Sequence, residues 1–346
     1  MSKAVIRAAK KTFIAFKNPY GSVEKVYPNI IEAYDNSGKN PVYYVGVKNT
    51  SLISPGFIHG LRAGGFYLHT LDKASVSGRA VDIFLQNPYT GRPMTGSSSG
   101  TAINVLLGIN DIGIGTDGGG SVLAPAISVN LFGFISPLLD AQKMKNNKTR
   151  VATDGVQFRP SLGCMSKKIE IVELFARMSL QGFEPKTNLR GARIFCDVLP
   201  EIDTKGFGIK KIDLSFKDAS REELLKKMPG LLASADVIVS REGPVDFEGM
   251  GDTVLGHFDS ATAALQKRGN KGFVRVANMA GATALVMPAG DFACAFVLMC
   301  ESTLPKINKM FGLARKMPAF AQADSAFDKY FSSAEEYFPG NFGDIE

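Results

Sequence analysis

Cysteine and histidine are scarce in this chain, and neither is arranged in a recognisable metal or redox motif. The 346 residues include three histidines and four cysteines. No two cysteines form a CxxC pair, which argues against a zinc knuckle, a thioredoxin-like redox motif and a disulfide framework. We predict that the thiols are buried or idle: Cys164, Cys196, Cys294 and Cys300.

Long apolar runs and linker-like segments are also missing. No apolar stretch approaches the roughly 20 residues needed to span a bilayer, and the first residues, MSKAVIRAAKKTFIAF, do not resemble a secretory signal. No Pro-rich, Gly/Ser-rich or highly charged linker divides the chain. With 45% apolar and 21% charged residues, the composition is that of a globular protein. The expectation is a single domain over residues 1–346, located in the cytoplasm and not in a membrane.

The net charge of +7 does not by itself indicate a nucleic-acid partner. The 40 lysines and arginines are spread along the chain, with only short clusters at Lys143–Arg150 and Lys205–Lys217. No aromatic-and-basic recognition motif accompanies them. The sequence therefore favours a solvated basic surface and no nucleic-acid binding.

Strand-like and helix-like segments alternate along the chain, which indicates an α/β layer fold. The strand-like segments are Val42–Val47, Asp111–Gly115, Ala192–Cys196, Val237–Val239 and Ala284–Met287. The helical patterns are Thr101–Leu107, Lys168–Leu180, Arg221–Met228 and Lys306–Ala314.

Two clusters of small residues lie in the segment 87–137. The first, TGSSSG, ends where a helical pattern begins, and the second, GTDGGGS, follows the short strand-like run DIGIG. Both could be ordinary loops, because glycine and serine are common in tight turns. They could also form an anion cradle, but no GK followed by Ser or Thr and no suitable GxGxxG motif is present. Nucleotide binding therefore ranks low.

GSSSG also fits the nucleophile elbow GxSxG, with Ser98 at its apex. That motif should follow a buried strand, whereas the preceding NPYTGRPMT is polar and turn-forming. The mechanism also needs a histidine base, and of His59, His69 and His257 only the last follows the serine. We therefore favour an ordinary structural role for all three histidines.

Lys48 offers another base for a serine nucleophile. It follows the strand-like run PVYYVGV, which could carry its side chain into the interior. Burial lowers the pKa of a lysine, and the neutral amine can take a proton from a hydroxyl group. A lysine after a strand is nevertheless most often a surface residue.

Together, the lysine and the two clusters resemble the amidase-signature family. Its enzymes have a lysine in a VKD-type motif, a serine in GGSSGG and a nucleophilic serine in GTDxGGS, for which this chain has VGVKNT, TGSSSG and GTDGGGS. Ser97 and Ser121 are 24 positions apart, as expected for the two serines of that family. The resemblance extends to LRAGGFYLHTLDKAS before the serine loop and to VRVANMAGATALVMPAGDFACAFVLM near the other end, and so covers nearly the whole chain.

The resemblance implies a large mixed central β-sheet with helices on both faces and a Ser-Ser-Lys triad for the hydrolysis of a carboxylic amide. In this scheme Ser121 forms the acyl-enzyme, and Ser97 relays protons to and from Lys48. The scheme requires no metal or organic cofactor. Ser97 would be joined to its neighbour by an unusual cis peptide, which costs about 3–4 kcal/mol for a non-proline residue. The oxyanion hole would consist of Gly118, Gly119 and Gly120, and the supporting residues would be Ser98, Thr116 and Asp117.

Several positions depart from the family pattern. Those closest to the triad are Asn49 in place of an aspartate, Ser99 in place of a glycine and Leu123 in place of an arginine; further away, Asn130, Ile135 and Thr283 also differ. These changes leave open a catalytically inactive, amidase-like binding or scaffold subunit. A subunit of an amidotransferase is a further alternative. The sequence does not identify the small-molecule amide, although an apolar or aromatic one would fit if Tyr43, Tyr44, Phe84 or Tyr89 lined the pocket. A homodimer also stays open.

Overall fold

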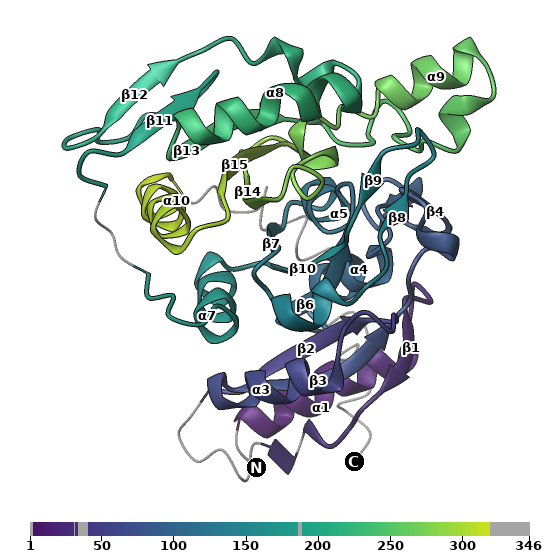
Figure 1. Ribbon diagram of the computed structural model, residues 1–346. Helices are drawn as coiled ribbons and strands as arrows, with labels where there is room; N and C mark the ends of the chain where they lie inside the picture. Colours follow the sequence, from purple (N-terminus) through teal and green to yellow (C-terminus); the bar gives the residue numbers. More distant parts are fainter. Residues whose placement is uncertain (1–2, 31, 34–40, 186–188, 319–346) are drawn as a thin grey trace, which may run out of the picture.

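Eleven strands form one mixed sheet that runs through the molecule (Figure 1). The computed structural model describes residues 3–30, 32–33, 41–185 and 189–318. In spatial order the strands are β1 (Val23–Val26), β3 (Phe66–Asp72), β2 (Tyr43–Lys48), β6 (Ile112–Asp117), β10 (Ser161–Ser166), β7 (Phe132–Ser136), β14 (Ala282–Pro288), β15 (Ala295–Glu301), β13 (Val237–Glu242), β11 (Arg193–Cys196) and β12 (Gly208–Lys211).

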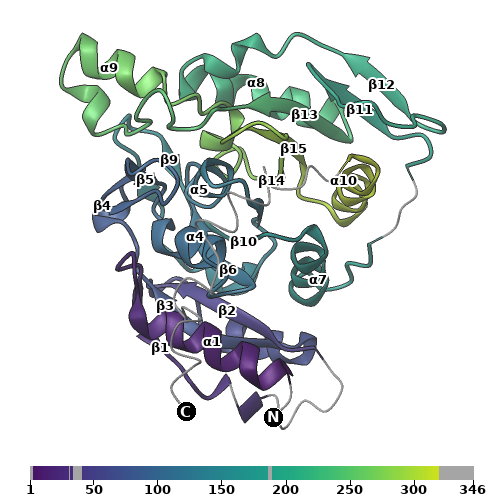
Figure 2. The same cartoon turned by 180° about the vertical axis from the view of Figure 1, so that it is seen from behind.

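The strand directions make this a mixed sheet, as predicted. β2 is parallel to both of its neighbours, β3 and β6. The centre, from β6 through β10, β7, β14 and β15 to β13, is antiparallel. Parallel pairing returns between β13, β11 and β12. Figures 1 and 2 show strands β1–β3 at one end of the sheet and β11 and β12 at the other.

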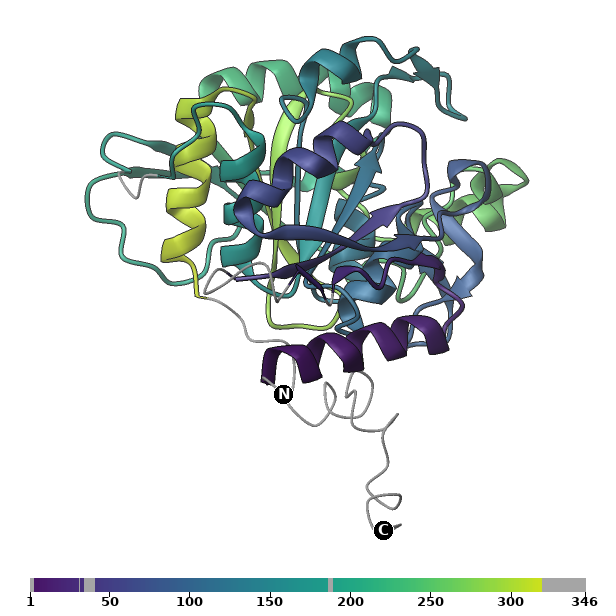
Figure 3. The ribbon, with the colours of Figure 1, turned by 90° about the horizontal axis from the view of Figure 1, so that it is seen from below.

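Helices cover both faces of the sheet because successive strand residues point to opposite sides. In β13, for example, Ile238 belongs to one hydrophobic cluster, while Val237 and Val239 belong to the other. One face is covered by α1 (Lys3–Lys17), α4 (Ser99–Leu106), α5 (Leu123–Ser128) and α8 (Arg221–Ser234). The other is covered by α3 (Pro55–Gly60), α7 (Ile169–Ser179) and α10 (Leu304–Lys316). Figure 3 shows α1 and α3 on opposite sides of the strands between them.

Two small hairpin sheets and two further helices are separate from the central sheet. The hairpins pair β4 (Val81–Gln86) with β5 (Pro93–Thr95) and β8 (Arg150–Val151) with β9 (Gln157–Phe158). The helices are α6 (Ala141–Lys145) and α9 (Ser260–Lys267). The hairpin β8–β9 matters for function, because its residues line the cavity described below.

Every strand and helix predicted from the sequence is present, with ends shifted by a few residues. The four cysteines are buried free thiols, as predicted. The sequence did not reveal β7 and β10 as strands, because all residues of both are buried and neither shows the alternation of a half-buried strand. Within the described ranges, no helix has the length and apolar character that crossing a bilayer requires.

A buried carboxyl group, that of Asp72, lies at the end of β3. It accepts hydrogen bonds from Thr70 Oγ1 at 2.6 Å and Asn104 Nδ2 at 2.7 Å. A Cβ on Gly46 of β2 would collide with its Oδ2, so a glycine is required at this point of the strand. Burial raises the pKa of Asp72 to about 7.

The raised pKa of Asp72 predicts a pH dependence of stability. The folded state holds this proton more tightly than the unfolded state, so the stabilisation is complete below about pH 4 and is lost as the pH rises through 7. With about 1.4 kcal/mol per pKa unit, the loss in the free energy of unfolding is on the order of 4 kcal/mol. We expect Asp72→Asn to be the more stable protein at pH 8 and to flatten the pH dependence between pH 4 and 8. Urea unfolding of both proteins across that range checks this; equal slopes would contradict it.

Candidate active site

The two serine loops meet at one end of the central strands. Ser97 precedes α4 and Ser121 precedes α5, and the backbone N–H of Ser98 donates to the carbonyl oxygen of Ser121 at 3.2 Å. Lys48 is the last residue of β2, and Thr116 and Asp117 end the parallel neighbour β6. Because parallel strands end at the same edge of a sheet, this topology brings together residues far apart in the sequence.

Lys48 lies in the interior, with 5% of its surface exposed. Its Nζ is 2.7 Å from Ser97 Oγ and 3.0 Å from Thr116 Oγ1. Desolvation lowers the pKa of Lys48 to about 7; Asp117 opposes this shift, and the nearby charge of Arg150 adds to it. Near neutral pH a substantial fraction of this amine is therefore unprotonated and can accept a proton from a hydroxyl group.

Asp117 shapes the loop that carries Ser121. Its carboxylate accepts hydrogen bonds from the backbone N–H groups of Gly120 at 2.8 Å, Val122 at 2.6 Å and Leu123 at 3.3 Å. Burial raises the pKa of this carboxyl group, while these hydrogen bonds and Lys48 lower it. Gly120 adopts φ +97°, a conformation that favours glycine. The aspartate thus holds the turn between β6 and α5 that presents Ser121.

Two expectations about these loops need correction. The cis peptide bond among the described residues is Gly243–Pro244, so the expected cis linkage at Ser97 is wrong. The trans chain, which avoids the cost of a non-proline cis bond, already places Ser97 Oγ within hydrogen-bonding distance of Lys48. In addition, the N–H of Gly120 donates to Asp117 and is not available as an oxyanion donor in this conformation.

Ser98 and Ser99 are both buried at the start of α4. Ser98 Oγ is buried without a hydrogen-bond partner among the described residues, and Ser99 Oγ donates to Asp82 Oδ2 at 2.6 Å. The preceding strand β5 belongs to the small hairpin sheet and not to the central sheet. The nucleophile elbow requires Ser98 to follow a buried strand of the central sheet, so this interpretation does not fit. The polar, turn-forming residues before Ser98 had already argued against it.

The histidines occupy dissimilar environments. His69 is buried, with ring nitrogens 3.2 Å from Thr12 Oγ1 and 2.9 Å from Asn110 Oδ1. His59 lies in α3, and His257 lies at the rim of the cavity described next, where Nδ1 contacts the carbonyl oxygen of Thr253.

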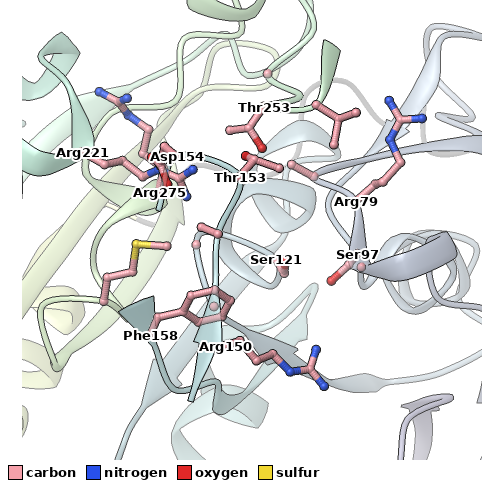
Figure 4. A pocket seen from close by; sticks show the side chains of 18 of the residues that line it. Arg79, Ser97, Ser121, Arg150, Thr153, Asp154, Phe158, Arg221, Thr253 and Arg275 are labelled. Atoms are coloured by element: carbon pink, nitrogen blue, oxygen red, sulfur yellow. The ribbon is translucent and has the colours of Figure 1, made fainter. Parts of the chain in front are cut away.

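A cavity of about 830 Å³ opens over the serine loops (Figure 4). Its lining includes Lys48, Ser97 and Ser121, together with Gly118 and Gly119. The remaining walls come from the segments that follow β2 and β3, the hairpin β8–β9, the start of α8, and the region from Gly251 through α9 to Met279. Most of these wall residues were not predicted from the sequence, chiefly the basic ones: Arg79, Arg150, Arg221, Lys267, Lys271 and Arg275.

The positions that depart from the family pattern find local roles or sit in the core. Asn49 Nδ2 donates to Glu24 Oε2 on β1. Asn130 has φ +53°, and its Oδ1 accepts from the backbone N–H of Ala293 at 2.9 Å. Leu123 and Ile135 are fully buried in the same hydrophobic cluster. None of these four side chains displaces Lys48, Ser97 or Ser121 from the cavity.

The lowered pKa of Lys48 predicts how activity depends on pH. If neutral Lys48 is the base, kcat/KM falls about tenfold per pH unit below 7 and levels off above it. A lysine with an ordinary pKa would instead shift the rise to about pH 10.5. Arg150→Met removes a nearby positive charge that lowers this pKa, so it is expected to move the midpoint upward. The pH profile of kcat/KM for both proteins is the measurement, and a profile without a step between pH 6 and 8 would contradict the prediction.

The chain matches a known family over part of its length. The family model described as Amidase matches residues 84–181, which include both serine loops. A comparison with curated protein sequences gave no match.

Solved structures of amidase-signature enzymes share the fold over most of this chain. A bacterial aryl acylamidase of the amidase signature family is 13% identical, with 95% of each chain covered and a TM-score of 0.63. A 6-aminohexanoate cyclic dimer hydrolase is 14% identical, covering 94% of this chain and 96% of its own, with a TM-score of 0.63. A glutamyl-tRNA(Gln) amidotransferase component from Thermotoga maritima is 14% identical, covering 89% of this chain and 91% of its own, with a TM-score of 0.57. The match to the family model over residues 84–181 and the shared fold make this chain similar to the amidase-signature enzymes.

Proposed function

We propose that the chain hydrolyses a carboxylic amide through an acyl-enzyme on Ser121, with Ser97 relaying protons to and from Lys48. The observation that carries this proposal is the contact of 2.7 Å between Lys48 Nζ and Ser97 Oγ, at the floor of a cavity that Ser121 also lines. A buried lysine with a pKa near 7 is matched to proton transfer at neutral pH.

Acylation begins when Ser121 Oγ attacks the amide carbonyl carbon. The hydroxyl proton of Ser121 passes to Ser97 as the proton of Ser97 passes to Lys48 Nζ. The C–N bond then breaks, and the same relay run backwards delivers the proton to the departing amine. Water next attacks the ester, its proton follows the relay, and the acid leaves while Ser121 regains its hydrogen. No redox step is involved.

The developing oxyanion needs donors near Ser121. Gly118, Gly119 and Ser121 line the cavity, and their backbone N–H groups are the donors that we propose, since that of Gly120 binds Asp117. Fixed N–H groups that already point to the developing charge stabilise it without reorganisation and are typically worth about 3–4 kcal/mol each. Asp117 would support catalysis indirectly by fixing the loop that carries these groups.

Trapping the acyl group tests this proposal. The chain is incubated with a panel of primary and N-aryl amides, and amine release is measured with and without hydroxylamine. An acyl-enzyme divides between water and hydroxylamine, so hydroxamate should appear at the expense of the acid. Ser121→Ala should release neither product, and Ser234→Ala, an exposed serine late in α8, should match the native chain. Amine release without hydroxamate would contradict a covalent intermediate, and no amine release from any amide would favour a binding or amidotransferase subunit.

A further inference from the structure

The cavity over Ser121 carries much more positive than negative charge. Two carboxylates line it, Asp154 and Asp218. Besides Lys48, whose pKa is near 7, its cationic residues are six: Arg79, Arg150, Arg221, Lys267, Lys271 and Arg275. Charges of one sign in a concave site raise the local concentration of a ligand of the opposite sign. The cavity is therefore suited to a substrate that carries negative charge.

Carboxylates outside the cavity neutralise only part of this charge. Arg79 pairs with Asp252, and Lys271 pairs with Asp246 at 2.7 Å. Arg275 instead donates to backbone carbonyls, among them that of Lys217 at 3.0 Å. Burial and the nearby charge of Arg221 lower the pKa of Arg275, whereas the carboxylates of Glu242, Asp218 and Asp154 raise it. The guanidinium groups of Arg221 and Arg275 thus repel each other, and the three carboxylates offset this repulsion in part.

Arg221 is the best placed of these cations to bind a ligand. Its side chain is 10% exposed, and Nε pairs with Asp154 Oδ2 at 2.5 Å. Nη2 is buried without a hydrogen-bond partner among the described residues, and leaving a donor of a charged group unpaired costs more than leaving a neutral one unpaired. Arg221 is also the first residue of α8, where the helix dipole is positive and disfavours a cation. A bound anion would relieve both costs.

The position of Arg221 relative to Ser121 indicates which part of the substrate it would contact. Its Nη1 lies 3.4 Å from the point that a Cβ on Gly119 would occupy, so the guanidinium group lies against the loop before the nucleophile. Figure 4 shows Ser97 on the other side of Ser121 from Arg221, Asp154 and Arg275. In the proposed mechanism the leaving amine receives its proton from Ser97, so the amine lies on the side of Ser97. The acyl part lies on the opposite side of the carbonyl carbon and therefore extends toward Arg221.

We infer that the natural substrate is an amide whose acyl part carries a second carboxylate, and that Arg221 binds this carboxylate. The inference rests on the proposed function and specifies the acyl group. Asp154 engages only Nε, which leaves the edge formed by Nη1 and Nη2 for the two parallel hydrogen bonds of a carboxylate. Arg221 acts in this account as a specificity residue and takes no part in proton transfer.

Binding to a protein that cannot turn over separates this inference from catalysis. In the Ser121→Ala background, calorimetry at low salt compares succinamic, glutaramic and adipamic acids with the uncharged butyramide, pentanamide and hexanamide. For at least one pair, the dissociation constant of the acid is expected to be lower than that of its uncharged counterpart by about tenfold or more. This is the contribution of one charge-assisted hydrogen bond. Adding Arg221→Met should abolish that preference, and Arg221→Lys, which keeps the charge but loses the fork, should retain part of it.

Asp154→Asn is the matched control for the lost ion pair. Arg221 also ties the turn between β8 and β9 to α8 through Asp154, so a purely structural role predicts that Asp154→Asn weakens binding as much as Arg221→Met. Binding of carboxylates predicts instead that Asp154→Asn keeps or strengthens the preference, because it removes a competing anion. Circular dichroism verifies that each variant is folded.

The outcomes for the inference and for the proposed function can be told apart. Equal affinity for charged and uncharged amides, no binding of any of them, or equal effects of Arg221→Met and Asp154→Asn would overturn the inference. If the preference depends on Arg221 but the native chain hydrolyses none of the bound amides, the carboxylate site stands and the proposed function fails. If the native chain hydrolyses the uncharged amides as efficiently as the acids, the function stands and the inference fails.

Discussion

Replacing Ser121 by alanine is expected to lower kcat/KM on the order of 10⁴-fold or more while leaving the fold intact. The variant loses the atom that forms the ester, and loss of a nucleophile removes most of the catalysis that the other groups provide. Ser121 lines the cavity and its side chain is partly accessible, so removing one oxygen atom should change the free energy of unfolding by less than about 1 kcal/mol.

Steady-state kinetics with one good amide, together with urea unfolding, provides the measurement. Ser234→Ala, the same chemical change on the exposed end of α8, is the matched control and should be neutral. If Ser121→Ala kept more than about a tenth of the native activity, another residue would have to be the nucleophile. Activity that instead depended on His257 would return the elbow mechanism to consideration.

The second large effect is expected from Lys48→Met. Methionine fills a similar volume but cannot accept a proton, so the variant should lose the general base that activates Ser97 and Ser121. Such a base contributes roughly 10²–10⁴ in rate, and we expect kcat/KM to fall by about 10³-fold. The remaining activity should no longer show a step near pH 7, which in the native chain reflects the lowered pKa of Lys48.

Lys48→Met should also show that Lys48 does not stabilise the fold. The side chain is buried, and burying an amine is unfavourable even where it has hydrogen-bond partners. The free energy of unfolding at pH 7 is therefore expected to stay the same or to rise. Lys226→Met, at an exposed position on α8, is the control and should leave both rate and pH profile unchanged. A native pH profile in Lys48→Met would exclude the lysine as the base.

The sequence was sufficient to predict three residues that the structure brings to one cavity, Lys48, Ser97 and Ser121, because their arrangement depends on local elements. GTDGGGS begins with the last three residues of β6 and leads into α5, so its turn needs a short side chain that can bind backbone N–H groups, which Asp117 provides. Lys48 ends the neighbouring parallel strand β2. The two neighbouring strands therefore bring Lys48 and the loop of Ser121 to the same edge of the sheet.

The walls of the cavity could not be predicted in the same way. Arg150 is the last residue of the basic cluster Lys143–Arg150, which the sequence indicated to be solvated surface. Its side chain is exposed, but it also lines the cavity because the hairpin β8–β9 folds over the cavity. The strands of that hairpin have two residues each, too few for a periodic pattern. Arg221 reaches the loop before Ser121 from 100 positions away, through the packing of α8.

The expected type of substrate also changes. Tyr43, Tyr44, Phe84 and Tyr89 were candidates for an aromatic pocket, but none of these four residues lines the cavity. Tyr44 is fully buried and Phe84 is largely exposed elsewhere. Aromatic residues fill cores as readily as pockets, so their identity alone could not distinguish the two. The basic lining, visible only once the loops are placed, supports an amide with an anionic acyl group instead.

The central claim is that Ser121 is a nucleophile activated through Ser97 and Lys48. It is tested most directly by intact-mass labelling with a fluorophosphonate, in which Ser121 Oγ would displace fluoride from phosphorus. We predict a single adduct on the peptide that contains Ser121, absent in Ser121→Ala and formed much more slowly in Lys48→Met. No adduct on the folded native chain, or an adduct that persists in Ser121→Ala, would contradict the claim.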